Sequence, residues 1–483
     1  MRLFTIGDSI SQGFMSLAAA KTELCYSTIL AECLGLKTGC TTDGNTEYIY
    51  PDWPANGLPF NMEAVLRCLE RRYDRDIKFL EWIGVPSIVN SYLDTTEKFY
   101  ECTDLYKDKP YHLPVKHFHN VSVFGNCVHD AWMLTPELCK TMIKKKKVSD
   151  DYFEGPSSPR YRTALRVLDP MLNGENRSAL DWLKYHCENE GVENIIIWLG
   201  ANNALGTLLK MKINEFNTAD PLNESYEKRD SCNLWSAENF ETDFRELIRR
   251  VNTILDNPKN KNPHTKVFIG TVPLVTIAPL AKGVGCATPY DKKNPDNNLY
   301  FESYSFVFFS DKTAAESQKS LSREDVIKID ERITGFNNSI ENIINEQGNN
   351  NRYYKVDICE ALLKMAFRRN NGHPTYEFPS LLKQQLLYNP TTLYYRVDRN
   401  GKIYNGGLFS LDGVHPTVIG QGIIAHEFRK VMEQSGVVFT KTIDWKKIVD
   451  SDTLTSYPLR LIEEMFQHDT LIRMIVRMLR WIR

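Results

Sequence analysis

Short apolar runs alternate with amphipathic stretches along much of this chain. The apolar runs predict buried β-strands and lie at residues 3–6, 121–124, 194–199 and 267–269. The amphipathic stretches carry apolar side chains at helical spacing and predict helices at residues 22–34, 240–255, 326–344 and 418–432. Strands that alternate with helices usually form parallel sheets. The pattern therefore predicts an α/β fold with a mostly parallel sheet, whose functional site lies at the carboxyl ends of the strands.

Five long stretches interrupt this alternation with polar, aromatic or Pro/Asn-rich sequence. They are residues 41–60, 144–159, 217–234, 289–323 and 370–407. Loops longer than about 15 residues are usually functional or disordered, so we interpret these stretches as insertions around one site. We therefore expect one α/β domain over residues 1–440 and a C-terminal helical extension over residues 441–483.

Composition and charge exclude several classes of function. The 483 residues include 59 Lys and Arg against 61 Asp and Glu, so no overall basic field favours nucleic acid, and we expect no such partner. The 11 cysteines are scattered without a Cys-x-x-Cys pair, which argues against a disulfide framework or a zinc ribbon. No signal-peptide core precedes the first strand, and no apolar stretch reaches the roughly 18 residues that span a bilayer. We expect a cytoplasmic protein.

The first predicted strand ends in the sequence Gly7-Asp8-Ser9. Glycine lets the backbone turn sharply, and a serine at such a strand-to-helix turn projects its hydroxyl beyond the sheet. Free N–H groups at the start of the following helix can stabilise a developing oxyanion. A helix N-cap without any catalytic role has the same local pattern. Ser9 is therefore a candidate nucleophile that requires a partner.

That partner occurs far downstream, where Asp412 and His415 lie three residues apart just before a predicted helix. A serine hydroxyl is a poor nucleophile until a base removes its proton, and histidine is the usual base at neutral pH. A carboxylate holds the correct tautomer of this base and stabilises the imidazolium. We therefore predict that His415 activates Ser9 and that Asp412 orients His415.

Two other strand ends carry possible oxyanion donors. Gly125 ends the run at residues 121–124, and its backbone N–H can point into the site. Asn202 follows the run at residues 194–199 and offers a side-chain amide. One such donor typically contributes about 3–4 kcal/mol of transition-state stabilisation.

Taken in order, these four segments resemble the block motifs of the SGNH (GDSL-type) hydrolases, a family of esterases and lipases. The resemblance implies that Ser9 is the nucleophile, that His415 is the general base and then the acid, and that Asp412 is its orienting partner. It also implies an oxyanion hole made by the N–H of Ser9, the N–H of Gly125 and the amide of Asn202. The fold it implies is a three-layer α/β/α sandwich around a parallel sheet.

The chain departs from the family pattern at one position of the third block. The family usually has Gly-x-Asn-Asp there, and Asn203 takes the place of the aspartate. Because Asn203 is not the predicted donor, we expect activity to survive with altered local hydrogen bonding. The chain is also much longer than a compact family member, so the resemblance does not imply a pocket shape or a substrate.

Several histidines near the second block could suggest a metal. His117, His119 and the pair His129–Asp130 do not follow a recognised zinc spacing, and the resemblance implies neither a metal nor a cofactor. We therefore expect no bound metal and no cofactor. These histidines are interpreted as lining the site or lying at the surface.

Residues 459–483 contain no glycine or proline and predict a basic amphipathic helix. One face carries isoleucine, leucine and valine, and the other carries Arg473, Arg477 and Arg480. Such a helix can pack on the body of the protein, lie on an anionic membrane as a peripheral contact, or bind a partner protein.

These observations together predict a serine hydrolase that cleaves carboxylic esters through an acyl-enzyme. A lipid ester is favoured by the terminal helix and by the aromatic and apolar insertions. The alternative substrate is an O-acetyl carbohydrate ester, and a third hypothesis is a non-catalytic interaction module on the same fold. The complete set of Ser9, His415 and Asp412 argues against this third hypothesis.

Overall fold

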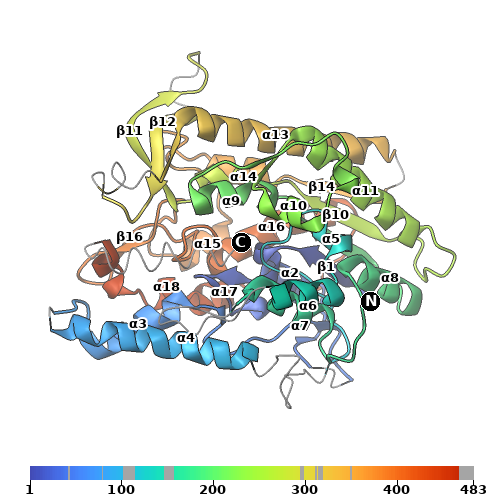
Figure 1. Ribbon diagram of the computed structural model, residues 1–483, viewed down its shortest axis with the longest axis horizontal. Coiled ribbons are helices and arrows are strands. Elements are labelled where there is room, and N and C mark those ends of the chain that lie inside the picture. The colour runs from blue at the N-terminus through green and yellow to red at the C-terminus, as the bar shows by residue number, and fades with distance from the viewer. Residues whose placement is uncertain are drawn as a thin grey trace.

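The computed structural model describes residues 1–41, 44–78, 80–101, 115–145, 157–293, 298–310, 313, 319–348 and 351–466. Its centre is a parallel sheet of four strands in the order β1–β7–β10–β14; β1, β10 and β14 are labelled in Figure 1. These strands are β1 (Leu3–Gly7), β7 (Asn194–Trp198), β10 (Lys266–Gly270) and β14 (Tyr353–Val356). The predicted α/β class with a parallel sheet is confirmed. The sequence pattern missed β14, whose short Tyr-Tyr-Lys-Val segment includes a lysine and is buried only at its two ends.

Residues 119–123 cover the edge of β1 that β7 leaves free. Val121 N–H donates to the Thr5 carbonyl at 3.0 Å, and Val123 N–H donates to the Gly7 carbonyl at 3.3 Å. This pairing with β1 is too irregular to make a strand, and it contains one isolated β-bridge, between Thr5 and Asn120. The predicted strand at residues 121–124 is therefore wrong as a regular strand, although the segment does run alongside β1.

Helices pack on both faces of the sheet. Trp198 is in register with Gly7, three residues after Phe4, so the side chains of Trp198 and Phe4 point to opposite faces. Trp198 contacts Tyr26 of α2 (Tyr26–Cys33) and Phe428 of α16 (Val418–Gln434). Phe4 contacts His186 of α8 (Ala179–Asn189) on the other face.

Two long helices complete the second face, and they confirm two of the predicted helices. They are α11 (Ala237–Leu255), which packs on α8, and α13 (Arg323–Glu346). Phe240 and Phe336 stack between them with ring centroids 4.1 Å apart. The predicted helix at residues 418–432 is confirmed as part of α16. The predicted helix at residues 22–34 is broken, because Cys25 is extended and separates a 3-10 turn at Thr22–Leu24 from α2.

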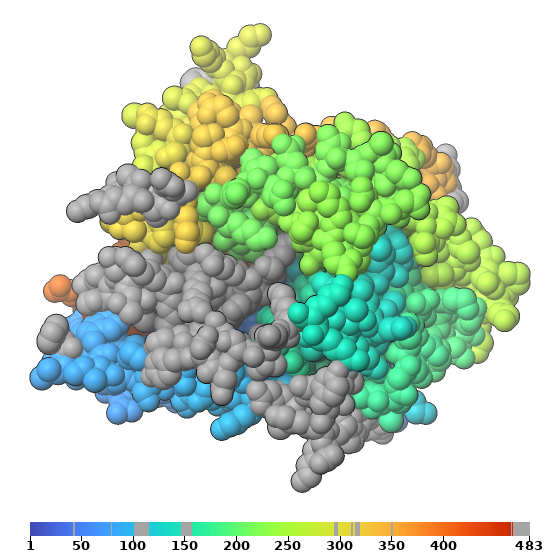
Figure 2. Space-filling view, in the orientation of Figure 1, coloured from blue at the N-terminus to red at the C-terminus, as the bar shows by residue number. Residues whose placement is uncertain are grey.

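Further helices and small sheets surround this core. The other helices are α1 (Ser9–Gln12), α3 (Met62–Tyr73), α4 (Val85–Glu101), α5 (Asp130–Met133), α6 (Pro136–Lys145), α7 (Pro159–Leu168), α9 (Asn202–Lys210), α10 (Tyr226–Ser231), α14 (Ile358–Met365) and α15 (Ser380–Gln385). Two small sheets have three strands each: one contains β2 (Phe14–Met15), β3 (Ala18–Ala19) and β6 (Leu58–Pro59), and the other contains β11 (Ala281–Pro289), β12 (Leu299–Phe306) and β13 (Ser320–Ser322). In the two-stranded sheets, β4 (Thr38–Gly39) pairs with β5 (Tyr48–Ile49), β8 (Glu215–Phe216) with β9 (Leu234–Trp235), and β15 (Arg396–Val397) with β16 (Ile403–Asn405). The β11–β12 hairpin projects from the body of the molecule (Figures 1 and 2).

The C-terminal region follows α16 as a series of short helices. They are α17 (Trp445–Ser451), α18 (Thr453–Ser456) and a 3-10 helix, η5 (Arg460–Phe466). The amphipathic helix predicted at residues 459–483 lies outside the described residues from residue 467 onward, and its described start is 3-10 rather than α. Within the described part of the chain, no helix combines the length and the apolar character needed to cross a membrane.

Candidate active site

The turn between β1 and α1 places Ser9 at the start of a helix of four residues. The turn is tight: a Cβ on Gly7 would lie 2.2 Å from Oγ of Ser11, so a side chain does not fit there. The Asp8 carboxylate caps the helix by accepting from Ile10 N–H at 3.1 Å. Ser9 is thereby held just beyond the carboxyl end of β1, as the sequence predicted.

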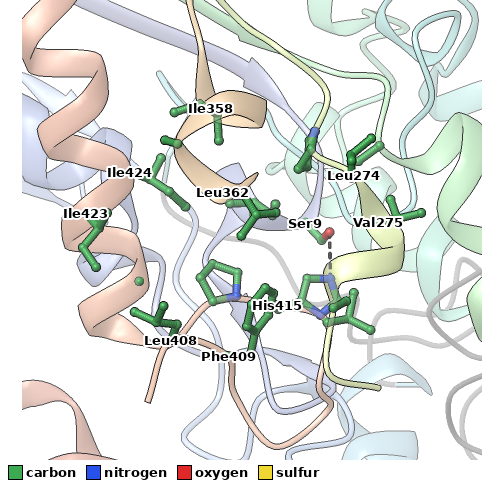
Figure 3. A pocket seen from close by; sticks show the side chains of 18 of the residues that line it. Ser9, Leu274, Val275, Ile358, Leu362, Leu408, Phe409, His415, Ile423 and Ile424 are labelled. Atoms are coloured by element: carbon green, nitrogen blue, oxygen red, sulfur yellow. Dashed lines mark hydrogen bonds between the residues drawn. The ribbon is translucent and has the colours of Figure 1, made fainter. Parts of the chain in front are cut away.

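Ser9, His415 and Asp412 form one continuous chain of hydrogen bonds. His415 Nε2 lies 2.9 Å from Ser9 Oγ (Figure 3). His415 Nδ1 lies 2.9 Å from Asp412 Oδ2. All three side chains are buried. The ring of Phe14 packs against the imidazole with centroids 4.7 Å apart, which restricts how the ring can turn. The structure therefore brings the three predicted residues together in the order that nucleophilic catalysis requires.

The loop that carries Asp412 and His415 is fixed by its own backbone. Ser410 N–H donates to the His415 carbonyl at 2.8 Å, and Leu280 N–H donates to the Gly413 carbonyl at 2.9 Å. Gly413 has a φ of 67°, and a Cβ there would lie 2.9 Å from Leu280 N. The loop ends at Thr417, which caps α16 through its side chain. This close approach explains the glycine between the carboxylate and the imidazole.

The Asp412 carboxylate is stabilised as an anion. Its oxygens accept from the backbone N–H groups of Leu17 at 3.0 Å, Val414 at 2.8 Å and His415 at 2.9 Å, as well as from the imidazole. Burial raises the pKa of Asp412, but the neighbouring His415 and these N–H donors outweigh burial and hold the pKa below its usual range. Asp412 is therefore ionised at neutral pH and able to stabilise an imidazolium.

Asp8 is a second buried carboxyl beside Ser9, and its environment is different. Burial raises the pKa of Asp8 to about 7, although the Ile10 N–H and the charge of His415 oppose the shift. The Asn202 amide Nδ2 lies 3.4 Å from Asp8 Oδ2. Sequence reasoning assigned Asp8 no role beyond the turn, and the structure places it on the wall of the cleft described below.

The two predicted oxyanion donors lie close together, because the Asn202 side chain contacts both Asp8 and the residue that follows Gly125. Asn202 begins α9, is fully buried, and donates through Nδ2 to the Asn126 carbonyl at 3.0 Å. Gly125 directly precedes Asn126 in a turn, where its φ of 79° favours glycine. Asn203, which departs from the family pattern, accepts from Val128 N–H at 3.3 Å and so ties α9 to the same turn. Their role as donors to an oxyanion stays a prediction.

Ser9 and His415 line a cleft of about 880 Å³, a volume that includes its opening to solvent. Its walls are largely apolar, and the charged, hydroxyl or imidazole side chains among them are Asp8, Ser9, His415 and Glu427. Figure 3 shows apolar side chains from three segments around the cleft: Leu274 and Val275; Ile358 and Leu362 of α14; and Ile423 and Ile424 of α16. Such a lining suits an apolar ligand placed next to the nucleophile.

The five stretches interpreted as insertions around one site do not line this cleft. Its lining residues belong to 8–10, 198–205, 273–278, 358–365 and 408–427, none of which falls within an interpreted insertion in the described part of the chain. The contribution of α14 was missed, because a helix of eight residues directly after an unrecognised strand gives little periodic signal.

The histidines near the second block lie away from the cleft. His129 is buried and stacks on Trp235, with Asp243 Oδ2 3.6 Å from its Nδ1. His117 and His119 contact His186 on α8. The interpretation that these histidines line the site or lie at the surface is therefore wrong for His119 and His129, and His117 is only partly exposed.

Comparison with protein-family models, with curated proteins and with solved structures found no match to this chain.

Proposed function

We propose that this protein is a serine hydrolase that cleaves carboxylic esters through an acyl-enzyme. The observation that carries the proposal is the hydrogen-bonded chain from Ser9 through His415 to Asp412, at one end of an apolar cleft. The resemblance of the four sequence blocks to SGNH hydrolases supports the same activity. The helices on both faces of the parallel sheet support the three-layer α/β/α sandwich that this resemblance implies.

The proposed reaction starts when Nε2 of His415 takes the proton of the Ser9 hydroxyl and Oγ attacks the ester carbonyl carbon. The N–H of Ser9, the N–H of Gly125 and the amide of Asn202 stabilise the oxyanion. The carbonyl then re-forms, the C–O bond to the alcohol breaks, and His415 gives its proton to the leaving alkoxide. A water activated by His415 hydrolyses the acyl-enzyme in the same way, which releases the acid and restores Ser9.

The cleft favours a lipid ester as the substrate. An acyl chain bound there would bury its methylene groups against α14 and α16, at about 0.8 kcal/mol for each group. An O-acetyl carbohydrate, the alternative substrate, needs polar partners for its hydroxyls, and the cleft offers few beyond the catalytic groups. A non-catalytic interaction module has no need for a connected Ser-His-Asp chain.

The test is hydrolysis of p-nitrophenyl acetate, butyrate, octanoate and palmitate by the wild type and by Ser9→Ala. We expect activity that Ser9→Ala abolishes, with kcat/KM higher for octanoate than for acetate. Ser122→Ala is the matched control, because it removes a buried hydroxyl that has no hydrogen-bond partner in the described residues. We expect this variant to keep the wild-type activity. An acetate optimum would favour the carbohydrate ester. No turnover of any ester, with no labelling of Ser9 by a fluorophosphonate, would refute the hydrolase.

A further inference from the structure

Four side chains outside the active site gather between α8 and the segment that covers β1. They are His117, His119, His186 and Glu190, and one ring nitrogen of each histidine and one oxygen of Glu190 all lie within 4.8 Å of one another. The ring of His186 is 4.6 Å from that of His117 and 5.1 Å from that of His119, measured between centroids. No other group of this kind occurs among the described residues.

Each of the three imidazoles has a buried nitrogen without a hydrogen-bond partner in the described part of the chain. These atoms are His117 Nδ1, His119 Nε2 and His186 Nε2. Buried polar atoms are nearly always paired, so three unpaired nitrogens in one cluster require an explanation. An imidazole nitrogen whose lone pair is free is the atom that binds a metal ion.

Two further contacts orient the rings. Ile49 N–H donates to His119 Nδ1 at 3.0 Å, which leaves Nε2 as the atom available to a ligand. With this hydrogen bond the neutral His119 ring carries its proton on Nε2, so a cation binds there once the proton has moved to Nδ1 and the bond from Ile49 N–H is lost. His186 Nδ1 lies 2.7 Å from Glu190 Oε1, so these two side chains offer ligand atoms that lie next to each other. The Glu190 carboxylate also supplies negative charge toward a divalent cation.

We propose that His117, His119, His186 and Glu190 bind one divalent transition-metal ion, with Zn²⁺ as the best match. Imidazole nitrogens together with one carboxylate form a ligand set that Zn²⁺ accepts in four-coordinate sites. This proposal replaces the expectation of no metal, which rested on sequence spacing. The spacing was uninformative because half of the cluster, His186 and Glu190, comes from α8 and its C-cap.

The site is structural rather than part of the ester chemistry. Phe4 contacts His186 near the start of β1, whereas Ser9 follows the other end of that strand, and the three steps from Phe4 to Gly7 alone span roughly 10 Å at about 3.3 Å per residue. A metal ion there would fasten α8 to residues 117–119. The His119 carbonyl accepts from Thr5 N–H at 2.8 Å, so the ion would also secure the covered edge of β1.

The experiment is a Zn²⁺ titration of untagged, chelator-stripped protein against a chromophoric competitor. We expect one Zn²⁺ per chain, with affinity reduced by more than about 100-fold in Glu190→Gln and in His119→Gln, because each variant removes a ligand and a change to an outer-shell partner alone typically costs 10- to 100-fold. Glu188→Gln, on the same helix, and His264→Gln, at an exposed position, are matched controls that keep the wild-type affinity. Wild-type affinity in His119→Gln, or less than one Zn²⁺ per wild-type chain, would overturn the proposal.

Co²⁺ loading of the wild type gives a reading that needs no variant. A four-coordinate site gives the intense visible absorption of tetrahedral Co²⁺, and Zn²⁺ displaces it. A spectrum like that of aqueous Co²⁺ contradicts the site. Zn²⁺ should also raise the Tm of the wild type and of Ser9→Ala equally, because the ion binds the native state away from the nucleophile.

Discussion

The backbone N–H of Leu17 donates to Oδ2 of Asp412 at 3.0 Å, the same oxygen that accepts from the His415 imidazole. Leu17 and Ser16 form the turn between β2 and β3 with φ values of 69° and 52°, as in the hairpin turns that usually need Asn or Gly. Such backbone strain costs about 1–3 kcal/mol per residue. The bonds from Ser16 N–H to Ser410 Oγ and from Leu17 N–H to Asp412 offset that cost, and they couple the turn that follows α1 to the loop that carries His415.

Asp412→Asn is predicted to lower kcat by about 10⁴-fold while leaving the fold intact. An asparagine can donate to Nδ1 of His415, which leaves the proton on Nε2, where it cannot accept from Ser9. The asparagine NH₂ group would also face a backbone N–H that donates to the carboxylate in the wild type. Because two donors then oppose each other, a modest loss of Tm is expected. Kinetics with a p-nitrophenyl ester and a circular dichroism spectrum check both statements. Unchanged kcat would exclude Asp412 from the catalytic chain.

Asn202→Ala is predicted to lower kcat by about 10²- to 10³-fold with little change in KM, because the proposed bond from the amide to the substrate oxygen forms only with the oxyanion. The matched control is Asn194→Ala, at the other end of β7, where the amide Nδ2 donates to the Arg2 carbonyl. Steady-state kinetics of both variants decide the point. An equal loss in both, or a loss confined to KM, would argue against an oxyanion role.

Asp8→Asn is predicted to become more stable relative to the wild type as the pH rises. The pKa of Asp8 is raised to about 7 in the folded protein from 3.8, so the unfolded chain ionises first and wild-type stability falls as pH rises between these values. Asparagine keeps an acceptor for Ile10 N–H without the buried charge.

Thermal unfolding at pH 5 and pH 8.5 tests this prediction about Asp8. The Tm of Asp8→Asn minus that of the wild type should be larger at pH 8.5. Asp220→Asn, at an exposed position, serves as the control and should show no such trend. A constant difference at the two pH values would mean that Asp8 does not titrate in this range.

Leu362→Trp is predicted to shift the acyl preference toward short chains, because the larger ring fills the cleft between α14 and α16. We expect kcat/KM for octanoate to fall at least tenfold relative to acetate. Lys364→Trp introduces the same ring at an exposed position of α14 that does not line the cleft, and it should leave the ratio unchanged. A parallel loss on both esters would indicate damage to the site rather than a shorter cleft.

Much of the fold could be predicted because three of the four sheet strands are continuous apolar runs. Both faces of β1 and β7 are completely buried, so apolar and polar residues do not need to alternate along these strands. The pattern failed where tertiary contacts decide the outcome. At residues 121–124, the apolar run pairs with β1 through a few irregular bonds, and no local signal distinguishes this from a strand.

The hydrogen-bonded chain of Ser9, His415 and Asp412 could be predicted because the sequence marks its members by their neighbours: Gly7 before Ser9, and Gly413 and Pro416 around His415. The cleft could not, because its walls are ordinary helix residues such as Leu362 and Ile424, whose shared location appears only on folding. The histidine cluster is a similar case. A His-x-His pair together with a His-x-x-x-Glu pair was visible in the sequence, but nothing connected them across the residues between.

The proposed nucleophile and its base come from residues 9 and 415 of a chain of 483. A ribosome must therefore complete most of the polypeptide before the two can meet, and under the proposed mechanism a nascent chain that lacks residue 415 carries a Ser9 that no base activates. The same arrangement allows a two-fragment version, in which the N- and C-terminal pieces would each be silent and would gain the proposed turnover only after they reassociate.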